Sequence, residues 1–285
     1  MLKGDIYLKE NIRNILDNGF LDVNPRPHYA DGTPAHTLSV NHVVQTYDLE
    51  KGELPLITLR KVAIKNSIKE ILWIYQDATS SLDVLEDKYD IHWWNEWEST
   101  VVPRTIGQRY GATVSKYNLM QNLLDELVKD PFGRRHIISL WQESDFLETD
   151  GLKPCAFLTI WNVRDSKNGK RYLDTMLIQR SSDYLTAGAI NQFQYICLQM
   201  MVARHCGYIP GKFTWVVANM QIYDRHIDNA NILLERNPIE CNPKIILNEE
   251  KTNFYDFTVD DFKLEEYPTK EIDSINPQLK FELGI

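Results

Sequence analysis

A fold of mixed helices and strands, of the α/β or α+β class, is what this sequence predicts. Apolar residues recur at helical spacing in three segments, residues 62–76, 117–129 and 190–205. The middle of the chain contains runs of β-branched and aromatic residues, which are typical of strands. No repeat or low-complexity linker divides the 285 residues, so we expect one domain over residues 1–285, although two average domains would also fit.

The first half of the chain predicts a loop and two helices. Residues 22–36 are rich in Pro, Asn, Gly and Asp and predict a long loop, and such loops in compact domains often carry function. The helix at residues 62–76 is apolar over much of its surface and contains Glu70. The helix at residues 117–129 ends before Pro131, which cannot continue it.

Strands are predicted on both sides of the third helix. The predicted helix at residues 190–205 includes Cys197, which we expect to be a packing residue because most free cysteines are buried in cores. The segments that predict strands are residues 136–141, 156–163, 172–179 and 213–223.

The dipeptide Asn168-Gly169 predicts a hairpin between two of these strands, because a type I′ turn requires positive φ at both central residues. This turn would pair Lys167 with Lys170. It would then place Cys155 opposite Ser182, and Arg180 opposite Phe157, on one face of the hairpin. A cysteine and an arginine distant in sequence are therefore expected to meet.

Charge and cysteine content restrict the class of protein. The net charge is −9, which disfavours a protein whose main task is to coat nucleic acid. The first residues lack the apolar stretch of a signal peptide, and no run of about 18 apolar residues predicts a membrane span. The four cysteines form no C-x-x-C pair and no zinc-ligand pattern, so we expect reduced thiols in a cytoplasmic protein without a metal.

Cys155 is the candidate nucleophile. A guanidinium beside a thiol favours the thiolate, which is the reactive form, so Arg180 would activate Cys155. The alternative is that Cys155 is a small buried hydrophobe and Arg180 a surface ion-pair partner.

Three other segments suit a phosphorylated nucleotide. Hydroxyl and charged donors gather at residues 179–183, as an anion would require. The pair Arg134 and Arg135 offers bidentate phosphate recognition, although a solvated charge pair is the commoner outcome. The amide of Asn191 can accept from uracil N3–H and donate to O4, or it can cap a helix.

Two aromatic or glycine-rich segments are weaker signals. The tryptophans of residues 93–97 could form a stacking wall for a heteroaromatic ring or a corner of the core. Residues 107–111, of sequence GQRYG, have glycines that would let the backbone approach a ligand.

In their order and spacing, these segments resemble the thymidylate synthase family from about residue 10 to Ile285. The stretches that carry the resemblance are Glu70-Ile71-Leu72-Trp73, Trp94-Asn95-Glu96-Trp97, residues 107–111, Asp130-Pro131 with Arg134-Arg135, Pro154-Cys155, Gln179-Arg180-Ser181 with Asp183, Asn191, Ile222-Tyr223, Tyr255-Asp256-Phe257 and the C-terminal isoleucine. The resemblance implies an α+β fold with a mixed sheet packed with helices, in a homodimer whose sheets pack face to face.

The resemblance also implies a reaction, the reductive methylation of dUMP to dTMP. Cys155 would add to C6 of dUMP, Tyr110 would act through water to help remove the C5 proton, and Glu70 would organise the proton network near O4. The co-substrate 5,10-methylenetetrahydrofolate would donate the carbon and the hydride and leave as dihydrofolate, so no metal is needed.

The binding residues are implied in the same way. Substrate would contact Arg26, Arg180, Ser181, Ser182, Asp183, Asn191, Gln221 and Tyr223, with Arg134 and Arg135 reaching in from the partner subunit. The folate would be bordered by Trp94, Trp97, Asp183, Gly284 and Ile285.

The sequence departs from the family at four places. Ala156 follows the nucleophile where the family commonly has His, Gln221 stands for a ribose-contacting His, and Asn219 stands for an Asp. The family's N-terminal phosphate loop is replaced by residues 24–33, in which Arg26 is the candidate phosphate ligand. With these histidines absent, activation of Cys155 is expected to depend mainly on the arginines.

Three rival functions remain. A hydroxymethylase of the same fold would act on dCMP, but cytosine favours an acidic reader where this chain has Asn191. A cysteine hydrolase would need a histidine base near Cys155. A non-catalytic nucleotide- or RNA-binding protein would not require Cys155, Glu70 and Tyr110 together.

Overall fold

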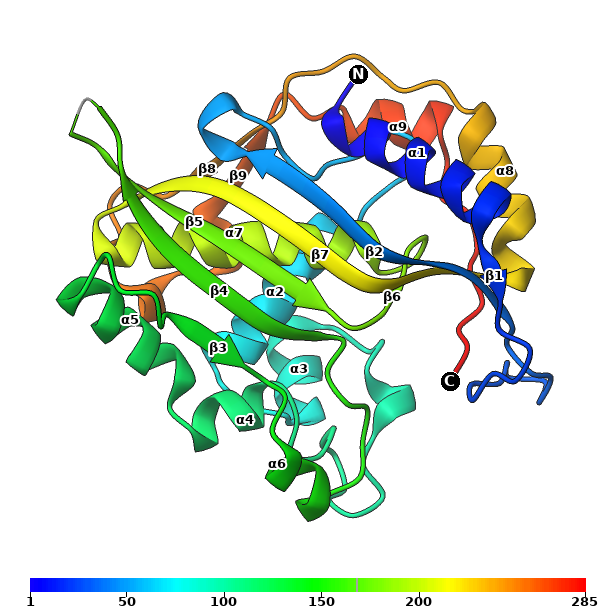
Figure 1. The fold of residues 1–285 in the computed structure, drawn as a ribbon, viewed down its shortest axis with the longest axis horizontal. Coiled ribbons are helices and arrows are strands. Elements are labelled where there is room, and N and C mark those ends of the chain that lie inside the picture. Colours follow the sequence, from blue (N-terminus) through cyan, green and yellow to red (C-terminus); the bar gives the residue numbers. More distant parts are fainter. Residues whose placement is uncertain (168) are drawn as a thin grey trace.

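The computed structural model describes residues 1–167 and 169–285, in which a mixed β sheet carries its longest helix, α7, on one face, with α2 behind it (Figure 1). The helices are α1 Lys3–Asn18, α2 Ile64–Tyr75, α3 Leu82–Tyr89, α4 Gly111–Lys116, α5 Leu119–Lys129, α6 Glu143–Glu148, α7 Gly188–Cys206, α8 Ile227–Glu235 and α9 Thr269–Ile275. The strands are β1 Phe20–Leu21, β2 Thr37–Asp48, β3 Ile137–Ser139, β4 Ala156–Asp165, β5 Arg171–Gln179, β6 Ser182–Asp183, β7 Ile209–Tyr223, β8 Lys244–Leu247 and β9 Phe262–Glu265.

The main sheet has seven strands in the order β1-β2-β7-β5-β4-β3, and the short β6 continues alongside β7. Strands β5 and β7 are parallel because α7 connects them, whereas β2–β7, β4–β5 and β3–β4 are antiparallel pairs. The ends of β5 and β7 therefore lie at the same edge of the sheet. The chain turns there through residues 180–187 into α7, and this edge is where the candidate site forms.

Helix α7 is buried over most of its surface because it packs between other elements. It contacts β5 and β7 on one side and α2 and α5 on the other. Cys197 is fully buried within it, which confirms its predicted packing role.

The opposite face of the sheet is apolar yet partly exposed. One cross-strand row consists of Ile137, Ile160, Met176, Thr214 and Thr46, and a second consists of Leu158, Ile178, Val216 and Val44. Val44, Ile137 and Met176 are exposed. A surface of this kind is typical of a protein–protein contact.

The predicted helices and strands are confirmed, with ends that differ by at most four residues. The predicted register of the hairpin is wrong. The backbone N–H of Ser166 donates to the carbonyl of Lys170 at 2.8 Å, so three residues rather than two separate the paired residues. Gly169 has a φ of 77° and supplies the left-handed residue of that longer connection, while Asn168 lies outside the described residues.

A bulge at Phe157 shifts the register once more near the end of the hairpin. As a result the backbone N–H of Arg180 donates to the carbonyl of Cys155 at 3.0 Å, so Cys155 lies opposite Arg180 and not opposite Ser182. The predicted proximity of the cysteine and the arginine is confirmed.

Candidate active site

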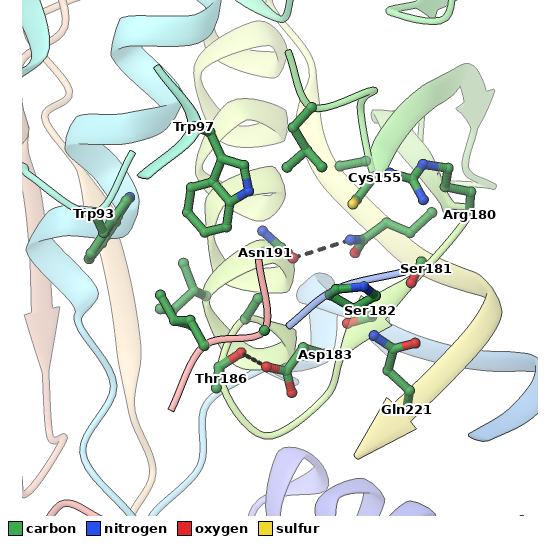
Figure 2. Close-up of a pocket in the computed structure, with 18 of the residues that line it drawn as sticks. Trp93, Trp97, Cys155, Arg180, Ser181, Ser182, Asp183, Thr186, Asn191 and Gln221 are labelled. Carbon is green, nitrogen blue, oxygen red and sulfur yellow. Dashed lines mark hydrogen bonds between the residues drawn. The ribbon is translucent and has the colours of Figure 1, made fainter. Parts of the chain in front are cut away.

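A cavity of about 460 Å³ opens at the edge where β5 and β7 end. Its walls come from segments far apart in sequence, and Figure 2 shows Cys155 and Arg180 side by side at one end of it. The predicted site residues that line it are Arg26, Glu70, Trp94, Trp97, Tyr110, Cys155, Arg180, Ser181, Ser182, Asp183, Asn191, Gln221, Tyr223 and Gly284.

Cys155 is fixed through its backbone. Its N–H donates to the hydroxyl of Tyr110 at 3.0 Å, and its carbonyl accepts the Arg180 N–H. Burial raises the pKa of the thiol, while the charges of Arg180 and Arg26 act to lower it. The arginines therefore favour thiolate as predicted, but burial outweighs them in the free protein.

Arg180 holds the backbone before Cys155 and also lines the cavity. Its guanidinium donates from Nη2 to the carbonyl of Lys153 at 2.7 Å and from Nε to that of Pro154 at 3.1 Å. These bonds hold the segment that leads to Cys155. They use two of the five guanidinium donors, which leaves the others for an anion in the cavity.

Glu70 lies on α2 and faces the cavity from the side opposite β7. The side chain is only 6% exposed and accepts a hydrogen bond from Nε1 of Trp93 at 2.7 Å. Burial raises the pKa of Glu70 to about 7. A carboxyl group that titrates near neutrality suits proton transfer.

Aromatic rings form one wall of the cavity. Trp94 packs edge to face against Trp97, with ring centroids 5.6 Å apart, and against Tyr110 at 5.2 Å. Trp93 also lines the cavity, although no pattern in the sequence predicted that this tryptophan would donate a hydrogen bond to Glu70. These rings offer a flat apolar surface to a heteroaromatic ligand.

Hydrogen-bonding groups form the opposite wall. Asn191 lies in the first turn of α7, whose N-cap is Ala187, so its alternative role as a cap is wrong. Its Oδ1 accepts from Gln179 at 3.1 Å and its Nδ2 donates to Gln194 at 3.2 Å. Gln179 belongs to the predicted donor segment at residues 179–183, whereas Gln194 was not predicted, although it lies three residues beyond Asn191 on the same helix face.

Two polar atoms in this wall have no partner among the residues described by the structure, namely the Ser182 hydroxyl and Oδ1 of Asp183. The other carboxylate oxygen of Asp183 accepts a hydrogen bond from Thr186 (Figure 2). Burial raises the pKa of Asp183. Because buried polar atoms are normally paired, these two are suited to a polar ligand.

The C-terminal tail meets the N-terminal loop beside the cavity. Residues His28 and Ile285 exchange two backbone hydrogen bonds, of 2.8 and 2.9 Å. The Tyr223 hydroxyl donates to the carbonyl of Gly284 at 3.4 Å, and a Cβ at Gly284 would lie 2.7 Å from the Tyr223 ring. Glycine is therefore required there, and Ile285 itself is not among the lining residues.

Two expectations concern residues that do not line the cavity of this chain. Arg134 and Arg135 are exposed just before β3 and do not line it. The glycines of residues 107–111 approach neighbouring backbone rather than a ligand, since a Cβ at Gly107 would lie 2.5 Å from the Asp150 carbonyl, and one at Gly111 2.2 Å from that of Thr79.

Other chemistries find little support in the part of the chain that the structure describes. No histidine lines the cavity, so a cysteine hydrolase has no base there. Residues 1–167 and 169–285 contain no cluster of His, Cys, Asp and Glu side chains that could hold a metal ion. None of the helices in those ranges is long and apolar enough to cross a membrane.

Comparison with known proteins gives one consistent result. The sequence model of the family described as thymidylate synthase matches residues 6–279. The chain is 50% identical over 286 residues to a thymidylate synthase of Lactococcus lactis subsp. cremoris, and 49% identical to one of Streptococcus pneumoniae, each with full coverage of both chains.

The fold agrees with the sequence. The structure matches a thermostable thymidylate synthase A from Bacillus subtilis with a TM-score of 0.87 and 34% identity, over 99% of each chain. The resemblance and the α+β fold with a mixed sheet packed with helices are thus confirmed. This chain belongs to the thymidylate synthase family of methyltransferases.

Proposed function

We propose that this protein converts dUMP to dTMP through a covalent bond between Sγ of Cys155 and C6 of the uracil, with 5,10-methylenetetrahydrofolate as co-substrate and dihydrofolate as second product. Membership of the family supports methylation of dUMP with this folate. The observation that carries the mechanism is the cavity that holds Cys155 between Arg180 and Arg26, with Glu70 and Tyr110 in the same space.

The phosphate of dUMP fits the end of the cavity beside Cys155. Arg180 has unused donors there, and Arg26 and Ser181 line the same end. A dianion bound by these groups would place the pyrimidine ring against the thiol. Gln221 and Tyr223, at the end of β7, then lie beside the ribose.

The uracil edge fits the polar wall. The amide of Asn191 can accept from N3–H and donate to O4, if its bonds to Gln179 and Gln194 are shared with the ring. The unpaired atoms of Ser182 and Asp183 supply further partners. These contacts would orient C6 toward Cys155.

The chemical steps then use groups already in place. The Cys155 thiol gives up its proton as the Sγ–C6 bond forms, and the negative charge develops on C5 and O4. Glu70, with a pKa of about 7, can exchange protons near O4. The Tyr110 hydroxyl accepts from the Cys155 amide and keeps its own proton to orient the water that removes the C5 proton. C5 would attack the one-carbon unit of the folate before it loses its proton, and loss of that proton would expel the folate from the new methylene carbon. Hydride transfer from the folate to this carbon would then break the Sγ–C6 bond and release dTMP.

The folate fits the remaining part of the cavity. It supplies the one-carbon unit and the hydride. Trp94 and Trp97 offer a wall for its ring, Asp183 an acceptor, and Gly284 with Ile285 a border that can exclude water.

A second copy of the chain completes the proposal. The two aliphatic rows on the exposed face of the sheet fit the same face of another copy related by twofold symmetry. Arg134 and Arg135 of each copy would then reach the phosphate in the other. The four free cysteines suit the reducing cytoplasm, where we place the protein.

Tritium release from [5-³H]dUMP, with and without the folate, tests the reaction. The protein should release tritium and form dTMP only when both substrates are present. Cys155→Ser should reduce both by at least about a thousandfold, as expected for loss of a nucleophile. Cys206→Ser, which removes another half-buried thiol, should leave both unchanged. Normal dTMP formation by Cys155→Ser, or turnover of dCMP in place of dUMP, would overturn the proposal.

A further inference from the structure

Arg109 is a buried arginine that the proposed reaction does not use. Its side chain is 2% exposed, and arginines are seldom buried to that extent unless they have partners. The guanidinium donates to three backbone carbonyls, those of Gln108 and Asp145 at 2.9 Å each and that of Thr149 at 2.8 Å. It also lies 4.8 Å from the centre of the Phe146 ring.

These bonds join the segment before Tyr110 to the segment before Cys155. The Asp145 carbonyl is one of the last four of α6, which have no partner within the helix. Thr149 begins the 149–155 loop that leads to Cys155, and its hydroxyl accepts a second bond from the backbone N–H of Gln108 at 2.7 Å. The two segments are therefore fixed to each other at one point by both bonds.

The next residue, Tyr110, has a strained backbone. Its φ is 46° and its ψ is −110°, a conformation that large side chains rarely adopt. Such a conformation persists only where the surroundings impose it. The hydrogen bonds of Arg109 constrain the backbone immediately before Tyr110. The Tyr110 hydroxyl in turn accepts a hydrogen bond from the Cys155 N–H at 3.0 Å. A change in the Tyr110 backbone would therefore move the acceptor of the nucleophile's amide.

The far end of the 149–155 loop has a corresponding support. Arg180 donates to the carbonyls of Lys153 and Pro154, so an arginine holds each end of the loop. The two differ in one respect: Arg180 lines the cavity and Arg109 does not. An effect of Arg109 on the reaction must therefore act through the residues that it holds.

We propose that Arg109 is a positioning residue, which holds Tyr110 in its strained conformation and the 149–155 loop in the place that aims Cys155 at the substrate. The inference rests on the proposed function for the reaction that it serves. Lysine cannot substitute, because an ammonium group cannot reach three carbonyls that a planar guanidinium reaches together.

The test compares Arg109→Met and Arg109→Lys with the parent protein and with Arg104→Met. Methionine keeps much of the apolar stem, and lysine keeps the charge. Arg104 lies on the same segment, but its ion pairs go to Asp83, Glu86 and Glu98 at the surface, so its replacement should leave activity unchanged. The number of active sites is measured by adduct formation with 5-fluoro-dUMP and the folate. The kcat is then calculated per active site, so unfolded protein does not lower it.

We expect kcat per counted site to fall by about 10- to 100-fold in Arg109→Met, which is the scale of a misplacement of about 1 Å, with KM for dUMP within about threefold. The kcat per site of Arg109→Lys should lie between those of the parent and of Arg109→Met. The lysine variant replaces the methionine variant in the test if the latter does not fold. The double variant Arg109→Met/Tyr110→Phe should lose less than the product of the single losses, because Arg109 acts through Tyr110. An unchanged kcat per site, or fully independent losses, would overturn the proposal.

A second readout does not depend on the reaction. The rate at which iodoacetamide alkylates Cys155, followed by peptide mass, should rise several-fold in Arg109→Met because the 149–155 loop opens more often. An unchanged rate would contradict the inference. If the parent protein made no dTMP, the proposed function would fail, and this measurement would still decide the role of Arg109.

Discussion

Cys155 is positioned by hydrogen bonds to its backbone, whereas the pKa of its thiol is set by burial and by the nearby arginines. The amide and carbonyl are both hydrogen-bonded, to Tyr110 and Arg180, and burial keeps the pKa of the thiol raised. Burial of this kind lowers the fraction of thiolate in the free protein. In the proposed reaction, Cys155 would therefore be protected between turnovers and would react once substrate is bound.

Glu70 provides a prediction at the scale of one residue. Burial raises its pKa from the ordinary value of 4.5 to about 7, so the folded protein retains a proton that the unfolded chain releases. The stability from this group is full below pH 4.5 and is lost as the pH rises to about 7. Glu70→Gln cannot titrate, so its free energy of unfolding relative to the parent should increase between pH 5 and pH 8.

Urea unfolding of both proteins at equal concentration measures this difference. The same pH dependence in Glu70→Gln and in the parent would mean that the carboxyl group titrates as it does in the unfolded chain.

At the scale of elements, the C-terminal tail and the N-terminal loop are joined by Arg225. Its guanidinium donates to Glu282 at 2.6 Å, and to Asp31 and Thr33 at 2.7 Å each, and it lies 4.0 Å from the centre of the Tyr29 ring. The tail carries Gly284 and the loop carries Arg26, and both residues line the cavity. The position of each therefore depends on this junction.

Arg225→Gln should therefore raise KM for both the folate and dUMP by about threefold to tenfold, with a smaller effect on kcat, since exposed ion pairs are individually weak. Steady-state kinetics measure it. Arg171→Gln, which removes a surface ion pair with Asp165 on the hairpin, is the control and should match the parent. Equal KM values in the two variants would show that the junction does not shape the cavity.

The same elements show what the sequence could and could not predict. Helices α2, α5 and α7 followed from periodicity, because burial imposes a repeated pattern on their residues, whereas α1 was missed. The hairpin register did not follow, since a three-residue connection and the bulge at Phe157 each move it by one position. Strand β2 was missed because its polar and apolar residues do not alternate strictly, as its outer face is itself partly apolar.

In the site, the residues that line the cavity were more predictable than those that hold them in place. Cys155, Arg180 and Asn191 carry distinctive chemistry in short motifs, and all three line the cavity. The roles of Trp93 and Arg109 depend on tertiary contacts, with Glu70 in one case and with the 149–155 loop in the other. No local pattern reports such contacts.

At the scale of the whole molecule, the proposed homodimer makes each site a shared one. Mixed refolding of Cys155→Ser with Arg134→Ala subunits tests this. Each mixed dimer would contain one site with both Cys155 and Arg134 intact, so random mixing of two inactive proteins should restore about a quarter of the parent activity. No recovery on mixing would contradict the contribution of Arg134 across the interface, provided that dimers are seen by light scattering.

The most direct test of the account is the covalent bond at Cys155. The analogue 5-fluoro-dUMP has a fluorine at C5 where dUMP has a hydrogen, and this fluorine cannot leave as a proton does. With 5,10-methylenetetrahydrofolate present, the reaction should therefore stop with both molecules attached. Intact-mass spectrometry should show the protein heavier by the sum of the two ligands, with the added mass on the peptide that contains Cys155, and no such species in Cys155→Ser. An unmodified protein, or an adduct on another cysteine, would contradict the account.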